Sequence, residues 1–275
     1  MEYRPLAEEL GIVQELAQGA GRLILNYYQS GIQVELKADK SPVTIADLEA
    51  NAFIVKGLKS AFPSDRILSE EGPLPELSPD TPRTWCVDPL DGTREFLAHN
   101  GEFSVMIGLA VKGEAVLGVL YQPTEDLLVW GSNGSAGGRK GGLSIKVGVS
   151  ACDRLADARV VVSRRRNPPL KESVQSKLSG AHLCPVGGMG IKVIRIATGE
   201  ADLYLGESDL AKEWDTCAPE AVLRAAGGLM TDGFGRPLRY NKSPPTTPFG
   251  WVASNGLLHG GGIEAVRSSL ENRTT

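Results

Sequence analysis

The feature that most constrains the fold is the segment 85–93, Trp-Cys-Val-Asp-Pro-Leu-Asp-Gly-Thr, in which an apolar run ends in two aspartates. A strand that ends in Asp-Pro-x-Asp and turns through Gly-Thr is expected to project Asp88 and Asp91 into a cleft beside a helix start. Mg²⁺ takes oxygen ligands and shares them with substrate phosphates, and backbone N–H groups opening a helix, near Gly92 and Thr93, face anions. The segment predicts a site for metal and phosphate, although such a turn can also be only a turn.

Three further segments place polar residues at the ends of expected elements. Ser-Glu-Glu-Gly at 69–72 follows an apolar pair, which puts Glu70 and Glu71 at the end of another short strand. Asp215 lies at the start of an expected helix, where its carboxylate can cap N–H groups or bind metal. Thr44 is typical of an N-cap and Asp47 of the acid three positions later in a capping box. Each of these segments alone has a purely structural explanation.

Together, the four segments resemble the lithium-sensitive, magnesium-dependent phosphatase superfamily of inositol monophosphatases, fructose-1,6-bisphosphatases and 3'(2'),5'-bisphosphate nucleotidases. The resemblance implies a layered αβαβα sandwich that combines α+β and α/β parts, and inhibition by lithium. It also implies that two or three Mg²⁺ ions are held by Glu70, Asp88, Asp91, Asp215 and the backbone carbonyl of Leu90, with Glu71 ranked after Glu70. In the family, residues matching Thr93 and Asp47 orient and deprotonate the attacking water, so no covalent intermediate is needed.

The amino-acid sequences of other segments resemble those of the bisphosphate nucleotidase branch. Residues 186–192, Val-Gly-Gly-Met-Gly-Ile-Lys, lead into a helix, and the matching turn and lysine of that branch contact the nucleotide. Residues 163–166, Ser-Arg-Arg-Arg, follow an apolar strand and could hold a second phosphate. The resemblance implies substrate contacts from Gly92, Thr93, Ser163, Arg166, Gly188, Lys192 and Asp215. The expected reaction is removal of the 3'-phosphate of adenosine 3',5'-bisphosphate to give AMP, which would clear a by-product of sulfate activation.

Other interpretations remain open at this point. The arginines from Arg164 to Arg166 can be a solvated basic loop, and Arg165-Arg166 replaces a Ser-His pair of some relatives, which puts the adenine contacts in doubt. Glu207 and Asp209 lie where inositol-specific relatives use an acid to bind sugar hydroxyls. The alternative substrate is therefore inositol-1-phosphate or a range of sugar phosphates.

Three other classes are disfavoured. Haloacid-dehalogenase-type phosphatases separate their two acids by one residue and use the first as a nucleophile, but two residues separate Asp88 from Asp91 here. The glycine-rich stretch 131–142 lacks the Gly-Lys-Ser/Thr of a phosphate loop, and we expect it to be a flexible surface connection. A non-catalytic phosphate sensor is disfavoured because every acid and Thr93 are present.

Composition limits the partners. The net charge of −4 and the pI near 5.6 argue against nucleic-acid binding, so the expected partner is a small phosphorylated molecule. No signal-like or membrane-spanning apolar segment is present in the sequence, and the four cysteines lack Cys-x-x-Cys spacing. These features favour a cytoplasmic protein. The sequence leaves open whether it is a monomer or a homodimer.

Apolar periodicity predicts two halves that meet near residue 150. In the half 1–150, helices are expected at about 5–29 and from Thr44, the latter with Ile45, Leu48, Ala52, Val55 and Leu58 as its core face. A strand is expected at 84–87, followed by a meander at 103–111, 116–121 and 127–130. The half 151–275 alternates strands at about 159–163, 182–186, 202–205, 229–232 and 250–253 with helices at about 168–178, 190–199, 215–226 and 256–271.

Overall fold

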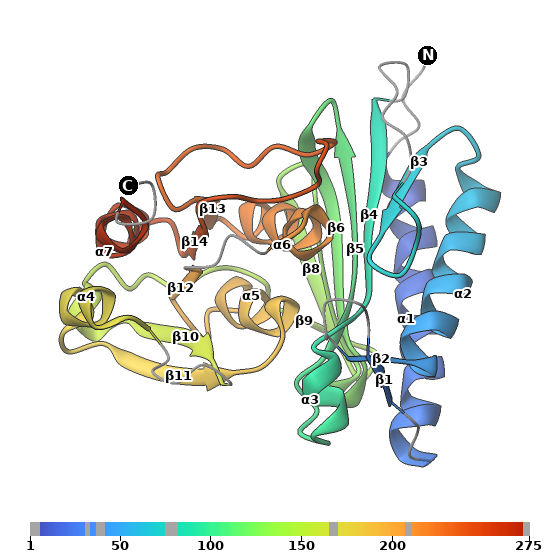
Figure 1. The fold of residues 1–275 in the computed structure, drawn as a ribbon, viewed down its shortest axis with the longest axis horizontal. Coiled ribbons are helices and arrows are strands. Elements are labelled where there is room, and N and C mark those ends of the chain that lie inside the picture. The colour runs from blue at the N-terminus through green and yellow to red at the C-terminus, as the bar shows by residue number, and fades with distance from the viewer. Residues whose placement is uncertain are drawn as a thin grey trace.

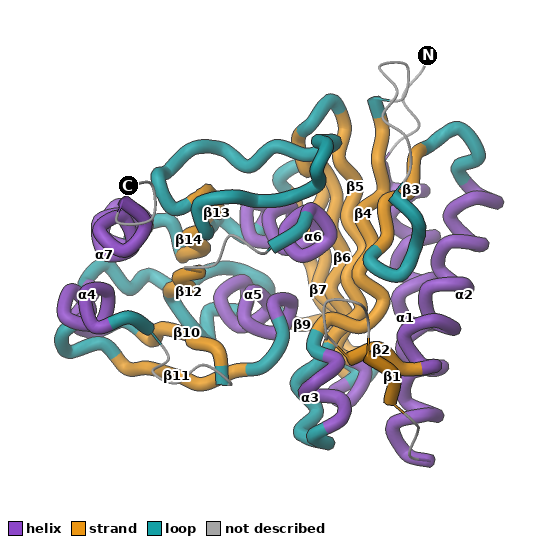
Figure 2. Tube along the Cα trace, viewed as in Figure 1, coloured by secondary structure: helices purple, strands orange, loops and turns teal. Residues whose placement is uncertain are grey.

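The computed structural model describes residues 6–30, 34–36, 42–74, 82–164, 170–206 and 211–271. Two sheets and three layers of helices alternate across the molecule (Figure 1), and the same layers stand out by type of secondary structure (Figure 2). Helices α1 (Leu6–Ser30) and α2 (Ile45–Ala61) form one outer layer, and α4 (Glu172–Gln175) and α7 (His259–Glu271) form the other. Helices α5 (Met189–Ala197) and α6 (Glu213–Ala225) lie between the sheets. The predicted αβαβα sandwich is confirmed.

The first sheet is a seven-stranded meander whose order follows the chain. Its strands β3 and β4 are parallel and the other neighbours are antiparallel. The strands are β3 (Arg66–Ser69), β4 (Arg83–Asp91), β5 (Ser104–Val111), β6 (Glu114–Gln122), β7 (Leu127–Ser132), β8 (Ser135–Lys140) and β9 (Leu143–Ile145). The predicted meander is confirmed, and a short helix α3 (Thr93–Leu97) connects β4 to β5.

The second sheet has five strands in the order β11-β10-β12-β14-β13 and mixes parallel with antiparallel pairs. Its strands are β10 (Arg159–Ser163), β11 (His182–Val186), β12 (Leu203–Gly206), β13 (Leu229–Asp232) and β14 (Trp251–Ser254). These match the predicted strands within about one residue. The helix expected at 168–178 is shorter, because α4 gives way to a 3-10 turn at Ser176–Leu178, and residues 165–169 lie outside the described part. Strands β1 (Val34–Leu36) and β2 (Pro42–Thr44) form a separate pair.

The side chains of strand β4 point alternately into two apolar cores, one on each face of the sheet. Trp85 and Val87 belong to the core under α1 and α2, whereas Cys86 belongs to the core that includes α5 and α6. All three side chains are fully buried. By the same alternation Asp88 faces α6. A carboxylate is thereby directed into the layer between the two sheets.

The predicted core face of α2 was only partly right: Leu58 is fully buried as predicted and Val55 is half-buried, but the other three predicted positions are exposed. Ile45 and Leu48 are 44% and 43% exposed, and Ala52 is also exposed, whereas the buried face contains Ala46, Ala50 and Ile54. Helix α2 carries apolar residues on both sides, so the sequence pattern did not decide which side meets α1 and the sheet. In the observed orientation of α2, Asp47 is also buried.

The glycine-rich stretch 131–142 is not a flexible connection, because its residues form the end of β7 and all of β8. A Cβ added at Gly131 would lie 2.6 Å from the carbonyl oxygen of Ala221 in α6, and one at Gly137 would lie 2.4 Å from the Trp130 ring. The glycines therefore permit close packing of helix and ring on the sheet.

The two sheets draw on separate stretches of chain, 66–145 and 159–254. Helix α6, however, packs against β4, β5, β6 and β7 of the first sheet. The division into halves at residue 150 stays a prediction, since the helices of the later stretch complete the core of the earlier one.

Candidate active site

The two aspartates of β4 are brought to one face by a β-bulge. Asp88 pairs with Met106 of β5, and Asp91 pairs with Ser104, so three steps along β4 match two steps along β5. In a regular strand, residues three apart point to opposite faces, but one extra residue restores them to the same face. Pro89 lies within the bulge, where its missing N–H costs no ladder hydrogen bond.

Asp47 is held by two elements at once. Its Oδ2 accepts hydrogen bonds from the Thr44 N–H at 2.7 Å and from the Thr44 hydroxyl at 2.6 Å, while Oδ1 accepts from the Thr93 hydroxyl at 3.1 Å. The predicted helix-start role of Thr44 and Asp47 is confirmed. The same carboxylate therefore caps α2 and touches Thr93 of α3.

Asp215 also lies in the first turn of its helix, and its Oδ2 accepts the Lys212 N–H at 2.7 Å. The sequence left open whether Asp215 caps the helix or binds metal, and one of its oxygens caps the helix. Glu70 follows β3, and its N–H donates to the carbonyl of Val87 in β4 at 3.1 Å. This bond fixes Glu70 beside the end of the strand that carries Asp88.

The acids raise one another's pKa values. Burial is the largest cause for Asp88, whose pKa is raised well above its usual range, and the negative charges of Glu70, Asp91, Asp215 and Asp47 add to the effect. Burial, followed by the charges of Glu70 and Asp91, raises the pKa of Asp215 to about 7 despite the Lys212 N–H. Burial also raises the pKa of Asp47 and Asp91. Carboxylates that repel each other in a buried place are stabilised by a cation.

The described residues contain no group of three or more His, Cys, Asp or Glu side chains that converge in positions able to hold a metal ion. Both oxygens of Asp91 accept hydrogen bonds, from the N–H groups of Met189 at 2.9 Å and Gly190 at 2.8 Å, and Ser104 adds a third at 3.1 Å. The donor set nevertheless fits Mg²⁺ chemically, because it consists of carboxylate and carbonyl oxygens and carries excess negative charge.

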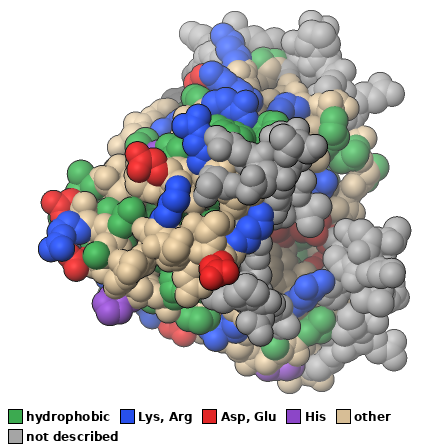
Figure 3. All heavy atoms as spheres, turned by 60° about the vertical axis from the view of Figure 1, so that its left-hand side comes forward, with side chains coloured by type: hydrophobic (Ala, Val, Ile, Leu, Met, Phe, Trp, Pro, Cys, Tyr) green, Lys and Arg blue, Asp and Glu red, His purple; other side chains and the backbone are tan. Residues whose placement is uncertain are grey.

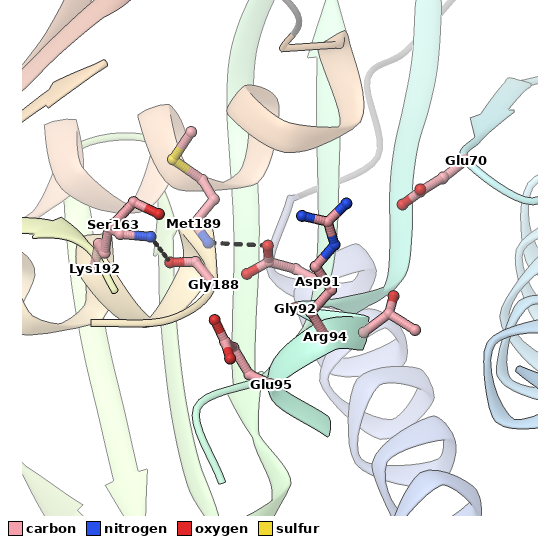
Figure 4. Close-up of a pocket in the computed structure, with 10 residues that line it drawn as sticks. Glu70, Asp91, Gly92, Arg94, Glu95, Ser163, Gly188, Met189 and Lys192 are labelled. Atoms are coloured by element: carbon pink, nitrogen blue, oxygen red, sulfur yellow. Dashed lines mark hydrogen bonds between the residues drawn. The ribbon is translucent and has the colours of Figure 1, made fainter. Parts of the chain in front are cut away.

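A cavity of about 350 Å³ joins most of the predicted residues. Its lining consists of Glu70, Asp91, Gly92, Thr93, Arg94, Glu95, Ser163, Gly188, Met189 and Lys192. Figure 4 shows Asp91 directed toward the start of α5, with Glu70 on the opposite side of the opening. In the space-filling view, acidic side chains are visible within a recess that has Lys and Arg side chains at its margin (Figure 3). The cavity thus combines negative and positive groups, as a site for metal and phosphate requires.

The glycine at the start of α5 is required by close packing. Gly188 has a left-handed backbone with φ of 48°, and a Cβ there would lie 2.7 Å from Asp91 Oδ2. Any other residue would push the α5 turn away from the carboxylate.

Lys192 is almost fully buried below this turn. Its ammonium donates to the carbonyl of Gly188 at 2.7 Å (Figure 4). It also donates to the carbonyl of Gly187 at 3.3 Å and lies 5.1 Å from the centre of the Tyr204 ring. Burial lowers the pKa of Lys192 to about 8, against the opposing charge of Asp91. The lysine is therefore mostly protonated at neutral pH, and in this structure it supports the turn.

Arg164 is tied to a residue that the sequence analysis did not single out. Its guanidinium donates to Glu102 from Nε at 3.0 Å and from Nη2 at 2.7 Å, and Glu102 also accepts the Gly187 N–H at 2.7 Å. Burial acts against these bonds, but Arg164 and the Gly187 N–H lower the pKa of Glu102. Arg164 is therefore not a free solvated arginine. Arg165, Arg166, Glu207 and Asp209 lie outside the described residues, so their predicted roles stay predictions.

Four residues at or beside the site were not predicted from the sequence: Arg94, Glu95, Glu102 and Ser104. Arg94 and Glu95 directly follow the Asp-Gly-Thr segment, so their position in the chain was a usable signal. Ser104 contacts Asp91, which lies 13 residues earlier, and Glu102 contacts Arg164 and Gly187 far along the chain, so no local pattern reveals them.

Comparison with known families decides the classification. A model of the "Inositol monophosphatase family" matches residues 6–271. The chain belongs to the inositol monophosphatase family. It is 38% identical over 237 residues to the 3'(2'),5'-bisphosphate nucleotidase CysQ of Escherichia coli K12, which covers 83% of this chain and 92% of the relative. It is also 32% identical over 235 residues to a histidinol-phosphatase of Chlorobaculum parvum, which covers 84% and 88% of the two chains.

Solved structures share the fold. CysQ from Bacteroides thetaiotaomicron aligns with a TM-score of 0.71 and 30% identity, covering 90% of this chain and 97% of that one. The extragenic suppressor protein SuhB from Bartonella henselae aligns with a TM-score of 0.79 and 26% identity, covering 94% and 98%. Within the described residues of this family member, no helix is long and apolar enough to span a membrane.

Proposed function

We propose that this protein is an Mg²⁺-dependent phosphomonoesterase that hydrolyses the 3'-phosphate of adenosine 3',5'-bisphosphate, giving AMP and phosphate. The observation that carries the proposal is the hydrogen bond from Thr93 to Asp47 beside a cluster of mutually repelling acids. The nucleotide is chosen because the chain is 38% identical to relatives that are named as 3'(2'),5'-bisphosphate nucleotidases.

The cation site consists, in this proposal, of Glu70, Asp88, Asp91, Asp215 and the carbonyl of Leu90. When bound, Mg²⁺ would neutralise phosphate charge and align the attacking and leaving oxygens. The raised pKa values of Asp88 and Asp215 support this assignment, since a bound cation would favour the ionised form of both acids. The number of ions, two or three, is part of the proposal.

Asp47 and Thr93 would activate the nucleophilic water. The Thr93 hydroxyl donates its hydrogen to Asp47, so an oxygen lone pair of Thr93 can accept a hydrogen bond from water. Burial raises the pKa of Asp47, which makes its carboxylate a stronger base. The proton of water would pass to Thr93 as the hydroxyl hydrogen passes to Asp47.

Substrate contacts are assigned to the cavity lining. Ser163, Gly188 and Lys192 lie on the side formed by β10 and α5, and Gly92 and Thr93 lie on the side formed by β4 and α3. Arg166 and Asp215 complete the proposed set. A protonated Lys192 adds positive charge on the side of the cavity where a substrate phosphate would bind.

A second candidate is a sugar-phosphate or related monophosphate phosphatase. It is favoured by the structural likeness to the inositol monophosphatase from Anabaena, with a TM-score of 0.76 and 27% identity, and by the 32% identity to a histidinol-phosphatase. The cavity of about 350 Å³ is of ordinary size for a small ligand, so its volume does not separate the candidates.

The test is phosphate release in the presence of Mg²⁺ from adenosine 3',5'-bisphosphate, inositol-1-phosphate and histidinol phosphate, each at several concentrations. We expect the highest kcat/KM with the nucleotide, and AMP as the product. Equal or reversed preference would favour the second candidate. Formation of adenosine 3'-phosphate would contradict the assignment of the 3'-phosphate as the leaving group.

A further inference from the structure

The connection between β13 and β14, residues 233–250, takes a long path that we call the strap. The two strands are antiparallel hydrogen-bonded neighbours, which a turn of two to five residues usually joins. The strap instead leaves the second sheet, crosses α6 and reaches the first sheet (Figure 1). Long connections of this kind inside a compact domain are commonly functional.

Several hydrogen bonds attach the strap to the first sheet and to α6. The Tyr240 N–H donates to the carbonyl of Gly113 at 3.1 Å, and the Tyr240 hydroxyl donates to Glu220 of α6 at 2.5 Å. The Thr247 N–H donates to the carbonyl of Ala211, just before α6, at 2.8 Å. The strap is thus attached near its middle, at Tyr240, and near its C-terminal end, at Thr247.

Asn241 in the strap contacts three elements. Its side-chain oxygen accepts hydrogen bonds from the Arg66 guanidinium in β3 and from the Thr84 hydroxyl in β4, the latter at 3.3 Å. Its backbone N–H donates to Glu213 of α6 at 2.8 Å. The backbone of Asn241 is left-handed with φ of 65°, a conformation that asparagine tolerates better than most residues.

These three elements are the ones that carry the proposed cation ligands. Strand β3 leads to Glu70, strand β4 carries Asp88 and Asp91, and helix α6 carries Asp215. Glu213 is fully buried and also accepts the Lys242 N–H at 2.9 Å. A buried carboxylate needs such partners, so the strap and the first turn of α6 hold each other in place.

We propose that Asn241 is a positioning residue for the cation site, and that the strap sets the affinity for Mg²⁺ by fixing β3, β4 and α6 relative to one another. This inference rests on the proposed function. Carboxylates of like charge repel, and their spacing relaxes unless the elements that carry them are tied together. Residues that orient metal ligands without touching the metal typically contribute about 10- to 100-fold to metal affinity.

The test variant is Asn241→Gly, because glycine accepts the left-handed backbone and keeps the N–H that bonds Glu213, but lacks the side-chain amide. We expect the Kd for Mg²⁺, measured by calorimetry without substrate, to rise about 10- to 100-fold. The KM for the nucleotide and kcat at saturating Mg²⁺ should change little.

Two control variants separate this effect from general loosening. Asn133→Gly alters another left-handed asparagine, at the turn between β7 and β8. Arg239→Ala removes the strap's ion pair with Glu114 (2.6 Å), which touches none of the proposed ligands. Both controls should bind Mg²⁺ as the unaltered protein does.

Unchanged Mg²⁺ affinity in folded Asn241→Gly would overturn the inference, even if the melting temperature falls, because a merely structural role would lower stability alone. If that variant does not fold, Glu213→Gln tests the same tie, and unchanged Mg²⁺ affinity there would overturn the inference equally. Failure of the unaltered protein to bind Mg²⁺ or release phosphate would contradict the proposed function itself.

Discussion

Asp47 and Asp215 occupy the same position in two different helices. Each is the third residue of its helix, and each accepts the N–H of the residue just before the helix through Oδ2. A carboxylate at this position stabilises the positive end of the helix. In Asp47 the other oxygen is bonded to Thr93. Helix capping and the proposed role of Asp47 in water activation would therefore use different oxygens of one side chain and would not compete.

The Thr93 hydroxyl gives a prediction at this scale. Thr93→Val keeps the size and branching of the side chain but removes the hydroxyl that links Asp47 to the proposed water. We expect kcat to fall about 10²- to 10⁴-fold, the range for loss of a general acid-base group, with little change in melting temperature. Steady-state phosphate release and thermal unfolding measure the two effects. Thr93→Ser, which retains a hydroxyl, should keep most of the activity, and near-normal kcat in Thr93→Val would refute the role.

At the scale of elements, the bulge in β4 shows what the sequence could predict. Asp-Pro-x-Asp at the end of an apolar run was enough to predict a strand that delivers both acids. The bulge itself depends on the register of pairing with β5, whose partner residue Ser104 lies 13 residues after Asp91 and outside the acidic segment. The local sequence predicted the strand, whereas its pairing with β5 determined the directions in which its side chains point.

The errors of sequence analysis have the same origin. The glycine-rich strand β8 resembled a loop because glycine is common in turns, yet its glycines serve packing against Trp130. The predicted face of α2 was partly wrong because apolar residues such as Ile45 and Leu48 lie on its exposed side. In both cases the deciding contact comes from another element, which a local pattern does not contain.

Glu102 gives a prediction for the element pair that borders the cavity. It precedes β5 and accepts hydrogen bonds from Arg164 after β10 and from the Gly187 N–H before α5. Glu102→Gln removes the charge that holds Arg164. Loss of one such bond, about 1.4 kcal/mol, would raise the KM for the nucleotide about tenfold, with a smaller effect on kcat.

Steady-state kinetics over a range of nucleotide concentrations separates KM from kcat for this variant. Glu125→Gln is the matched control, because it removes an exposed ion pair with Lys140 at 2.8 Å, a kind that contributes little. An unchanged KM in Glu102→Gln would show that the Arg164 contact does not shape the cavity.

On the scale of the whole molecule, α5 and α6 join the two sheets. Helix α6 follows the second sheet's β12 in the chain but packs on the first sheet, and α5 presents its N-terminal N–H groups to Asp91 of β4. The proposed site is therefore assembled only when both sheets and the two inner helices are in place.

The buried Glu220 of α6 gives a prediction for global stability. Burial, the largest cause, raises its pKa to about 7 although Tyr240 donates a hydrogen bond to it. Between about pH 4.5 and 7 the folded protein therefore binds more protons than the unfolded chain. Protonated Glu220 therefore increases the free energy of unfolding at low pH. This contribution, on the order of 2–3 kcal/mol, is lost as the pH rises through 7.

Unfolding by urea between pH 5 and 8, with a chelator present, measures this effect. Glu220→Gln should lose less stability than the unaltered protein over that range. Glu114→Gln is the control, since the pKa of the exposed Glu114 is lowered, first by its hydrogen bond from Arg239. Identical pH profiles for Glu220→Gln and the unaltered protein would contradict the raised pKa.

The central claim is that the acids gathered at the end of β4 support metal-dependent phosphate hydrolysis. Its most direct test is the rate of phosphate release from adenosine 3',5'-bisphosphate as a function of Mg²⁺ concentration, for the unaltered protein and for Asp91→Asn. We expect release that requires Mg²⁺ and that is abolished in the folded variant, because one ligand and one negative charge are lost. Release without a divalent cation, or undiminished release by Asp91→Asn, would contradict the claim.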